Sequence, residues 1–300
     1  MRRGNPRADL ATICGVVIAG TGILGGLLME GGRIKDVMQI TAAFIVIGGT
    51  LGAVLVSTPL AVVTGAARRF RHVVFDRGHS PNALIEEIIA YATKARKNGL
   101  VSLELEAAKI GDPFLRKALN LAVDGADLQE IRKMMELQIE IEEQHALAEA
   151  RVFESAGGYS PTIGIIGAVL GLIQVMKNLA NIDEVGRGIA VAFVATVYGV
   201  GLANIFLLPA ANKIKARIHE DTQRKELMLE GVAGIVEGLN PKLIRSKLDA
   251  YARAEPEVEK KADEVEKKAG KNADKNNDAA ASRPAAKPAV TEAHAAPARP

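Results

Sequence analysis

The sequence holds few of the residue arrangements that carry catalysis or metal binding. Its 300 residues include no tryptophan and a single cysteine, Cys14, which lies within an apolar run. Disulfide bonds and cysteine-ligated metal sites are therefore excluded within these residues. The five histidines never stand at a ligand spacing with carboxylates, and there is neither a Gly-x-x-x-x-Gly-Lys-Ser/Thr phosphate loop nor a serine or cysteine nucleophile in a recognisable context. We expect neither an enzyme nor a bound cofactor.

Neither sign of charge dominates. The 38 basic and 35 acidic residues leave a net charge of +3, so nothing favours nucleic acid as a partner. Hydrophobic residues make up 48% of the chain. This share suits a membrane protein with a polar portion.

Charged residues are absent from long stretches of the chain. Four apolar runs cover about residues 10–29, 40–64, 160–176 and 188–211. Each is close to the ~20 residues that a helix needs to cross a hydrocarbon core of ~30 Å. The first run follows a basic start, but it is long for a signal peptide and lacks a convincing cleavage site, so we interpret it as a retained span. The sequence predicts an all-α, polytopic membrane protein with four transmembrane helices and a cytoplasmic helical domain.

Basic clusters mark one side of the membrane. They precede the first run and follow the second and fourth runs: Arg2, Arg3, Arg7, Arg68, Arg69, Arg71, Lys213, Lys215 and Arg217. By the positive-inside rule, both termini and the segment 65–159 are predicted to be cytoplasmic.

The chain therefore divides into five parts. The last is charged, rich in proline and free of aromatic residues, which predicts disorder. In order, the parts are an N-terminal transmembrane pair at 1–64, a cytoplasmic helical domain at 65–159, a transmembrane hairpin at 160–211, a cytoplasmic helix at 212–253 and the tail at 254–300.

Glycine and proline set the expected helix ends in the cytoplasmic parts. A helix opening at Asn82 should end at Asn98-Gly99, because glycine commonly follows a helix C-terminus. LVSLELEAAKI should form a short helix, and Phe114 to Val123 another. From Asp127 a long helix leads into the third span. The chain after Pro209 should stay helical to about Gly231 and bundle with the helix at 127–155.

Small residues form a stripe on each helix of the hairpin. Those of the first helix share one face, as do those of the second: Gly164, Gly167, Ala168 and Gly171, then Ala192, Thr196, Gly199 and Ala203. Small residues allow helix backbones to approach closely in lipid. Either the stripes hold the hairpin together, or one of them faces a partner helix or lines a path, with Thr196 as its polar member.

Two prolines stand at matching ends of the hairpin. Ser160-Pro161 resembles an N-cap followed by proline at the first helical position. Pro209 should kink the helix as it leaves the membrane. Both prolines are either simple start and bend signals or hinges.

None of the four runs contains a carboxylate, lysine, arginine or histidine. Ion pathways through membranes usually carry one. Either this chain moves no ion, or a partner helix supplies the carboxylate.

The whole pattern resembles the A subunit of bacterial flagellar stators, the MotA/PomA family. The resemblance covers about residues 10–250: four spans, a large cytoplasmic segment between the second and third spans, and a charged helix after the fourth. MEGG at 29–32 is similar to the family's glycine pair after the first span. ATKARKNGLVSLELEA resembles the stretch whose arginine and glutamate contact the rotor, here Arg96 and Glu104, although Leu105 stands where some relatives continue with further charges.

The resemblance also implies roles for the hairpin. Pro161 and Pro209 fall at the family's two prolines, and Thr196 falls where a threonine faces the partner's ion-binding aspartate. It implies a bacterial inner-membrane complex in which several A subunits surround single-span B subunits, each carrying an intramembrane aspartate. Proton or sodium flow past that aspartate would drive the A subunits to turn against the rotor of the flagellar switch. The partner-facing or ion-path set is then Thr196, Gly164, Gly167, Gly171, Ala192 and Gly199.

Two other functions remain open at this point. An ion-driven energiser of the ExbB/TolQ type shares the small-residue hairpin, but two spans before the large segment favour the stator. A structural membrane scaffold without ion flux is the second alternative.

Overall fold

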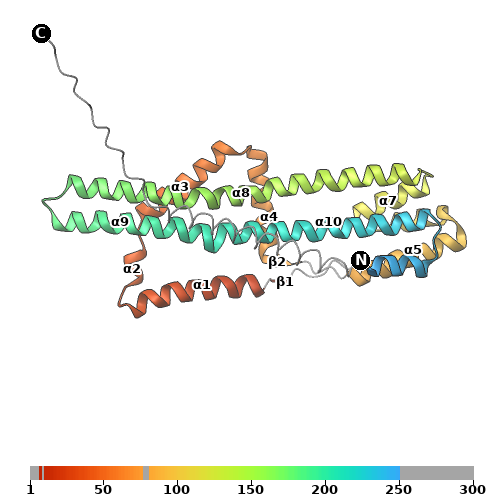
Figure 1. Cartoon of the computed structure of the whole chain (residues 1–300), viewed down its shortest axis with the longest axis horizontal. Coiled ribbons are helices and arrows are strands. Elements are labelled where there is room, and N and C mark those ends of the chain that lie inside the picture. Colours follow the sequence, from red (N-terminus) through yellow and green to blue (C-terminus); the bar gives the residue numbers. More distant parts are fainter. Residues whose placement is uncertain (1–6, 9, 77–80, 251–300) are drawn as a thin grey trace, which may run out of the picture. The chain divides into compact units, whose positions relative to one another are not determined.

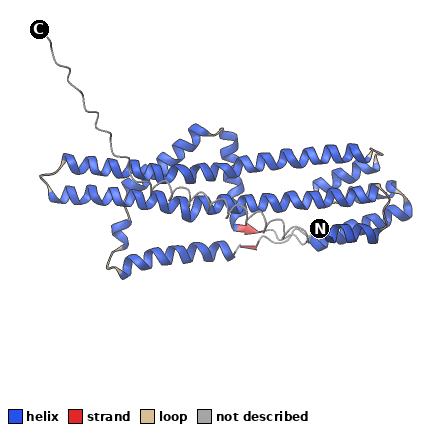
Figure 2. Ribbon diagram, in the orientation of Figure 1, coloured by secondary structure: helices blue, strands red, loops and turns tan. Residues whose placement is uncertain are grey.

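The computed structural model describes residues 7–8, 10–76 and 81–250, and nearly all of them are helical (Figure 2). The predicted disordered tail at 254–300 lies outside the described residues, as do Arg2 and Arg3. Within the described ranges, the only strands are β1, Arg7–Ala8, and β2, Phe75–Asp76, which pair antiparallel. Contacts divide the chain after Leu248.

Four helices are long and apolar enough to span a membrane, as the sequence predicts. The first, α1, covers Leu10–Met29 and matches the predicted range. After the short α2, Ile34–Val37, comes the second spanning helix, α3, Ile40–Ser57. The other two spans are segments of longer helices. The all-helical membrane architecture is therefore confirmed.

The third and fourth spans belong to two long helices that lie side by side (Figure 1). The 50 residues of α8, Leu128–Lys177, form one unbroken helix. After a short turn, α9, Ile182–Gly201, continues through a π-helical segment, η2, Leu202–Leu207, into α10, Leu208–Val236. The predicted bundling of the last helix with 127–155 is confirmed, since one cluster buries Ala146, Ala150, Ala210, Ile214 and Ile218.

The second spanning helix is shorter than the predicted run of 40–64. It ends at Ser57 because Thr58 is extended, with φ −135° and ψ 134°. Thr58 precedes Pro59, and proline disfavours helical backbone in the residue before it. A separate helix, α4, Leu60–Val74, follows the proline.

Helix α4 is fixed to α8 by three kinds of contact. Ala66 is buried in a cluster with Val152 of α8. The rings of Phe70 and Phe153 stack with their centroids 5.7 Å apart. Arg69 forms an ion pair with Glu149.

The helices that were predicted to be cytoplasmic begin and end largely where the sequence predicts. Helix α5 covers Pro81–Asn98 and stops at Gly99, whose φ of 81° favours glycine. Helix α7 covers Pro113–Val123. Its N-cap residue is Asp112, whose carboxylate accepts hydrogen bonds from the amides of Phe114 and Leu115. The single helix predicted over LVSLELEAAKI is wrong. That stretch is a 3-10 turn, η1, Leu100–Leu103, followed by one α-helical turn, α6, Glu104–Ala107.

Ion pairs join the long helices once they leave the apolar segments. Lys215 Nζ lies 2.5 Å from Glu154 Oε1, and Lys225 Nζ lies 2.7 Å from Glu142 Oε2. These pairs connect α10 to α8 on the polar side of the hairpin. Surface pairs contribute about 0–1 kcal/mol each, so the apolar cluster between the helices contributes more to this contact.

Glu230 joins three helices at the far end of this bundle. Its Oε2 lies 3.1 Å from Arg132 Nη1 of α8, and its Oε1 contacts Lys247 of the helix at 241–250. Burial raises the pKa of the Glu230 carboxyl, but hydrogen bonds from Lys247 and Arg132 outweigh it and hold that pKa below its usual value. The carboxylate therefore stays charged and keeps both partners.

Candidate functional site

The two helices of the hairpin meet through glycine. A Cβ built on Gly199 would lie 2.6 Å from the carbonyl oxygen of Ser160 and 3.0 Å from Gly164 Cα. One built on Gly171 would lie 2.7 Å from the carbonyl oxygen of Gly188 and 2.8 Å from the amide nitrogen of Ala192. Backbone atoms leave no room for a side chain at either position.

These contacts decide between the two interpretations of the small-residue stripes. The glycines and alanine predicted to face a partner are buried between α8 and α9, where they pack on each other: Gly164, Gly167, Gly171, Ala192 and Gly199. The hairpin itself covers these five residues in this chain, and their partner-facing or ion-path role stays a prediction. The stripes hold the hairpin together.

Helix α3 packs beside this contact and is fastened by a tyrosine. Ala42 and Val46 are buried with Val194 and Ala195 of α9. The hydroxyl of Tyr198 donates a hydrogen bond to the carbonyl of Val37 at 2.6 Å and accepts one from the amide of Gln39 at 3.4 Å. Tyr198 thus anchors the turn before α3 to α9. Nothing in its sequence neighbourhood pointed to this role.

The outward face of the hairpin is apolar. On α9, Phe193 is 71% exposed and Val197 and Val200 are also exposed, with Thr196 beside them only partly buried. The Thr196 hydroxyl donates to the carbonyl of Ala192 in its own helix at 3.2 Å. Thr196 is therefore the predicted residue that remains accessible to another helix.

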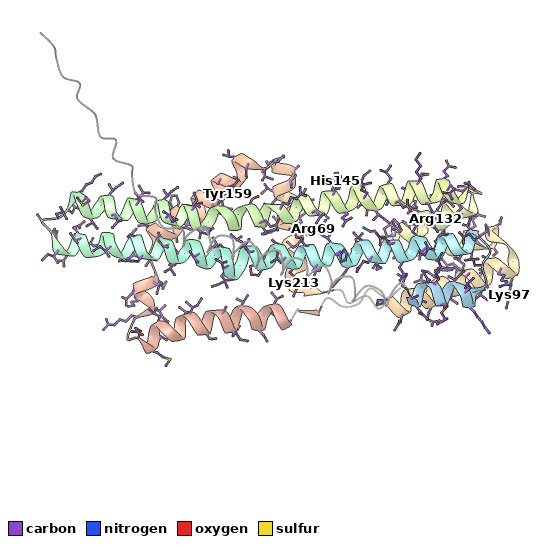
Figure 3. All side chains as sticks on the ribbon, in the orientation of Figure 1. Arg69, Lys97, Arg132, His145, Tyr159 and Lys213 are labelled. Atoms are coloured by element: carbon purple, nitrogen blue, oxygen red, sulfur yellow. The ribbon has the colours of Figure 1, made fainter. Side chains whose placement is uncertain are left out.

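The first spanning helix is attached to the rest of the chain at one end. None of the residues in its apolar window, Thr12–Met29, is buried. Near its start, Lys213 Nζ donates to the hydroxyl of Thr12 at 2.6 Å (Lys213 is labelled in Figure 3). The apolar surface of α1 is thus left for lipid or for other chains.

Both prolines lie inside continuous helix, which corrects the prediction of a helix start at Ser160-Pro161. Helix α8 passes through Pro161 without a break, and Ser160 is fully buried. The Ser160 hydroxyl caps no helix, because it donates to the carbonyl of Gly199 across the hairpin at 2.9 Å.

The kink predicted at Pro209 takes the form of the π-helical segment η2. Pro209 is the second residue of α10, directly after that segment. There the amide of Leu208 reaches back five residues to the carbonyl of Ala203. Proline has no backbone N–H to donate to the preceding turn of the helix. The wider π-helical turn before Pro209 lets the helix continue without that hydrogen bond.

The predicted rotor-contact residues lie on the surface. Arg96 is in the last turn of α5 and Glu104 begins α6, with Gly99 and η1 between them. Both side chains are exposed, and neither has an ion-pair partner among the residues that the structure describes. Lys97, next to Arg96, is labelled in Figure 3.

Two apolar side chains accompany this pair, and their exposure was not predicted from the sequence. Val101 is 69% and Leu105 is 76% exposed, on the same short segment as Glu104. The segment is held from beneath by the buried Leu103 and Ala107 and by an ion pair of 2.8 Å between Lys94 and Glu106. The surface therefore combines charge of both signs with exposed apolar area on a fixed base.

No group of three histidine, cysteine or carboxylate side chains stands close enough to hold a metal ion in the part of the chain that the structure describes.

Comparison with known proteins gives consistent matches along the chain. Residues 106–227 match the MotA/TolQ/ExbB proton channel family, and residues 13–99 match the Motility protein A N-terminal family. Motility protein A of Bacillus subtilis is 34% identical over 250 residues, which cover 82% of this chain and 92% of that protein. Chemotaxis protein PomA of Vibrio alginolyticus is 31% identical, over 81% of this chain and 95% of that protein. The flagellar MotAB stator complex from Bacillus subtilis has a chain of similar structure, with a TM-score of 0.77 and 32% identity over 84% of this chain and 99% of that one.

Proposed function

The chain belongs to the MotA/PomA family of flagellar motor stator subunits, and from that membership we propose how its own residues couple ion flow to torque. Stator subunits of this family are membrane ion-channel components rather than enzymes. The match over residues 13–99 is to the motility protein, which favours the stator over the ExbB/TolQ energiser.

We propose that the ion-binding carboxylate comes from a single-span B subunit. The observation that carries this proposal is that no span of this chain contains a carboxylate, lysine, arginine or histidine. A charge at the centre of a bilayer costs ~2.5–3.5 kcal/mol on insertion scales, so it is retained only where it has a task. The similar solved structures of MotAB stator complexes support such a partner and an oligomer.

The partner's helix docks on the outward face of α9 in this proposal. The glycine stripes are already occupied within the hairpin, so the accessible hydroxyl is that of Thr196, beside the exposed Phe193 and Val197. A threonine hydroxyl has lone pairs for a passing cation and a hydrogen for a carboxylate. Thr196 would then face the partner's aspartate and solvate the coupling ion, a proton or sodium.

Ion flux in vesicles tests this arrangement. Vesicles with this subunit alone should hold a proton or sodium gradient, whereas vesicles with the subunit and its B partner should conduct. Thr196→Val should lower that conductance, because the methyl group that replaces the hydroxyl offers no lone pair. Thr21→Val is the matched control, since the Thr21 hydroxyl is exposed on α1 and donates to Val17 of its own helix at 2.7 Å. Conductance by the subunit alone would overturn the proposal, and an unchanged Thr196→Val complex would remove the hydroxyl from it.

We propose that the chain lies in the bacterial inner membrane with both termini and the segment 65–159 in the cytoplasm. The basic residues at 68–69 and 213–217 support this orientation, because they follow the second and fourth spans on one side. A reporter that is active only in the periplasm should work when fused after Gly32 or near Asp183. It should stay inactive when fused after Gly99, and activity at Gly99 would reverse the orientation.

The surface around Arg96 and Glu104 is the proposed contact with the rotor of the flagellar switch. Exposed charges of both signs and the exposed Val101 and Leu105 provide an electrostatic and an apolar element. Complementary charges steer association and set its register.

We also propose that Pro161 and Pro209 form the hinge through which ion binding in the membrane changes the angle of the cytoplasmic helices. Each interrupts the hydrogen-bond ladder of one long helix. Ladder defects of this kind are where helices bend.

A further inference from the structure

Ser160 is the buried hydroxyl that connects the two long helices at the level of Pro161. It is 0% exposed, and its bond to the Gly199 carbonyl joins residues that are 39 positions apart. Within an apolar surrounding a hydroxyl without a partner costs free energy, so Ser160 requires an acceptor. The hydroxyls of Thr21, Thr162 and Thr196 meet the same need within their own helices.

A second acceptor for Ser160 exists in its own helix. In a regular helix the carbonyl of Gly157 accepts from the amide of residue 161, which in this chain is a proline without an amide hydrogen. Ser160 stands three positions after Gly157. Thr162 makes a bond of this same spacing to the carbonyl of Tyr159, at 2.7 Å. Rotation about χ1 of Ser160 would therefore move its hydrogen bond from Gly199 to Gly157.

The acceptor across the hairpin also lies beside an irregular turn. Gly199 precedes η2 by three residues, and the amide of Leu202 is shared between the carbonyls of Gly199 and Tyr198. Further along, the amide of Leu208 reaches Ala203 instead of residue 204. The backbone hydrogen bonds of this helix therefore change from a four-residue to a five-residue spacing over the segment that follows Gly199. Gly199 is the residue that Ser160 contacts.

We propose that Ser160 is a positioning residue with two states, which controls the hinge. In the first, its hydroxyl binds the Gly199 carbonyl and holds α8 against the helix that contains η2. In the second, it binds the Gly157 carbonyl that Pro161 leaves free, and the two long helices can change their angle at this level. This inference rests on the proposed hinge and names the contact that holds it closed.

Two substitutions are expected to act in opposite directions. Ser160→Ala removes the donor of both bonds. The closed state then loses its contact across the hairpin, whereas the second state loses only a bond within α8, so the range of helix angles widens. Pro161→Ala restores an amide that occupies the Gly157 carbonyl, which removes the second acceptor and narrows that range. Interhelical polar bonds in membranes average ~0.6 kcal/mol and reach ~1.7 kcal/mol, so the ratio of the two states should change by about 3- to 20-fold.

The measurement is a distance between spin labels on either side of Pro161. Labels at the exposed positions Leu137 and Met176, in a background of Cys14→Ser, report the bending of α8. The labelled chain is diluted with unlabelled chain, so that each complex with the B partner in nanodiscs carries one labelled copy. The distance distribution should be broader than wild type for Ser160→Ala and narrower for Pro161→Ala. Thr162→Val, which removes an exposed hydroxyl two residues away, should leave it unchanged.

Equal widths in wild type, Ser160→Ala and Pro161→Ala would overturn the two-state assignment. If Ser160→Ala does not assemble, Ser160→Cys, whose thiol is a weaker donor, is measured in its place. An unbroadened Ser160→Cys distribution, or loss of that variant as well, would reduce Ser160 to a packing residue. The distance requires neither ion flow nor a rotor, so a negative result leaves the proposed stator mechanism standing, and a failed flux experiment leaves the distance result valid.

Discussion

Gly199→Val is expected to leave no assembled protein in the membrane. Its Cβ would lie 2.6 Å from a backbone oxygen of Ser160 and 3.0 Å from the Cα of Gly164, and neither atom can move without separating α8 from α9. Overpacking costs ~1–3 kcal/mol where side chains can adjust, and more is expected where only backbone is available. Separation would also break the Ser160 bond and withdraw the surface on which α3 packs. The measurement is the amount of full-length protein in membranes and its elution as a complex after mild detergent extraction.

Gly52→Val provides the matched control. Gly52 lies in the spanning helix α3, is exposed, and has no atom within 4 Å of a built Cβ. It should accumulate and assemble like the wild type, because the new side chain faces outward. Normal amounts of Gly199→Val would show that the hairpin is looser than the structure has it, and loss of Gly52→Val would point to a general intolerance of larger residues.

Reversal of the charges at Arg96 and Glu104 is expected to stop swimming without changing the amount of protein in the membrane. Both side chains are exposed and form no ion pair within the described chain, so Arg96→Glu and Glu104→Lys remove nothing that holds the fold. Exposed pairs contribute ~0.2–1 kcal/mol each, but a reversal replaces attraction by repulsion and acts on every subunit of the complex. Swimming speed in soft agar and single-motor torque are the measurements. The double reversal should be fully non-motile.

Arg116→Glu tests whether position matters. Arg116 is exposed on α7, a different helix from those that carry Arg96 and Glu104, so this variant should swim. Restoration of motility by reversed charges on the rotor protein would identify the contact. Normal swimming of both single variants would assign Arg96 and Glu104 to ordinary solvated surface.

The membrane pattern of this chain could be predicted because it depends on local signals. The apolar run at 10–29 coincides with α1, and Gly99 ends α5 where its positive φ requires. Asp127 caps α8 by accepting from the amide of Gln129, at the position where the long helix was expected to begin. Each of these features is determined by a few neighbouring residues.

The errors at the candidate site arose where the outcome depends on a second helix. Ser160-Pro161 has the sequence of a helix start, yet contacts with α9 and α10 keep α8 continuous through it. Spacing showed that Gly164 and Gly199 belong to stripes, but it could not show that the stripes pack on each other. The hydrogen bond from Ser160 to Gly199 and the anchor at Tyr198 join residues far apart in the chain, and no local pattern announces them.

The position of Pro161 within the 50 residues of α8 divides the helix into arms of unequal length. With a rise of ~1.5 Å per residue, the arm to Leu128 measures about 50 Å and the arm to Lys177 about 24 Å. A pivot at Pro161 is therefore a lever with a ratio of about two to one. A tilt of roughly 5° would carry the end at Lys177 about 2 Å and the end at Leu128 about 4 Å, with about half the force at the longer arm. Because α8 is continuous, a small displacement at the Lys177 end, no larger than an ion's coordination shell, produces a larger displacement at the Leu128 end. That larger displacement is enough to move one protein surface across another.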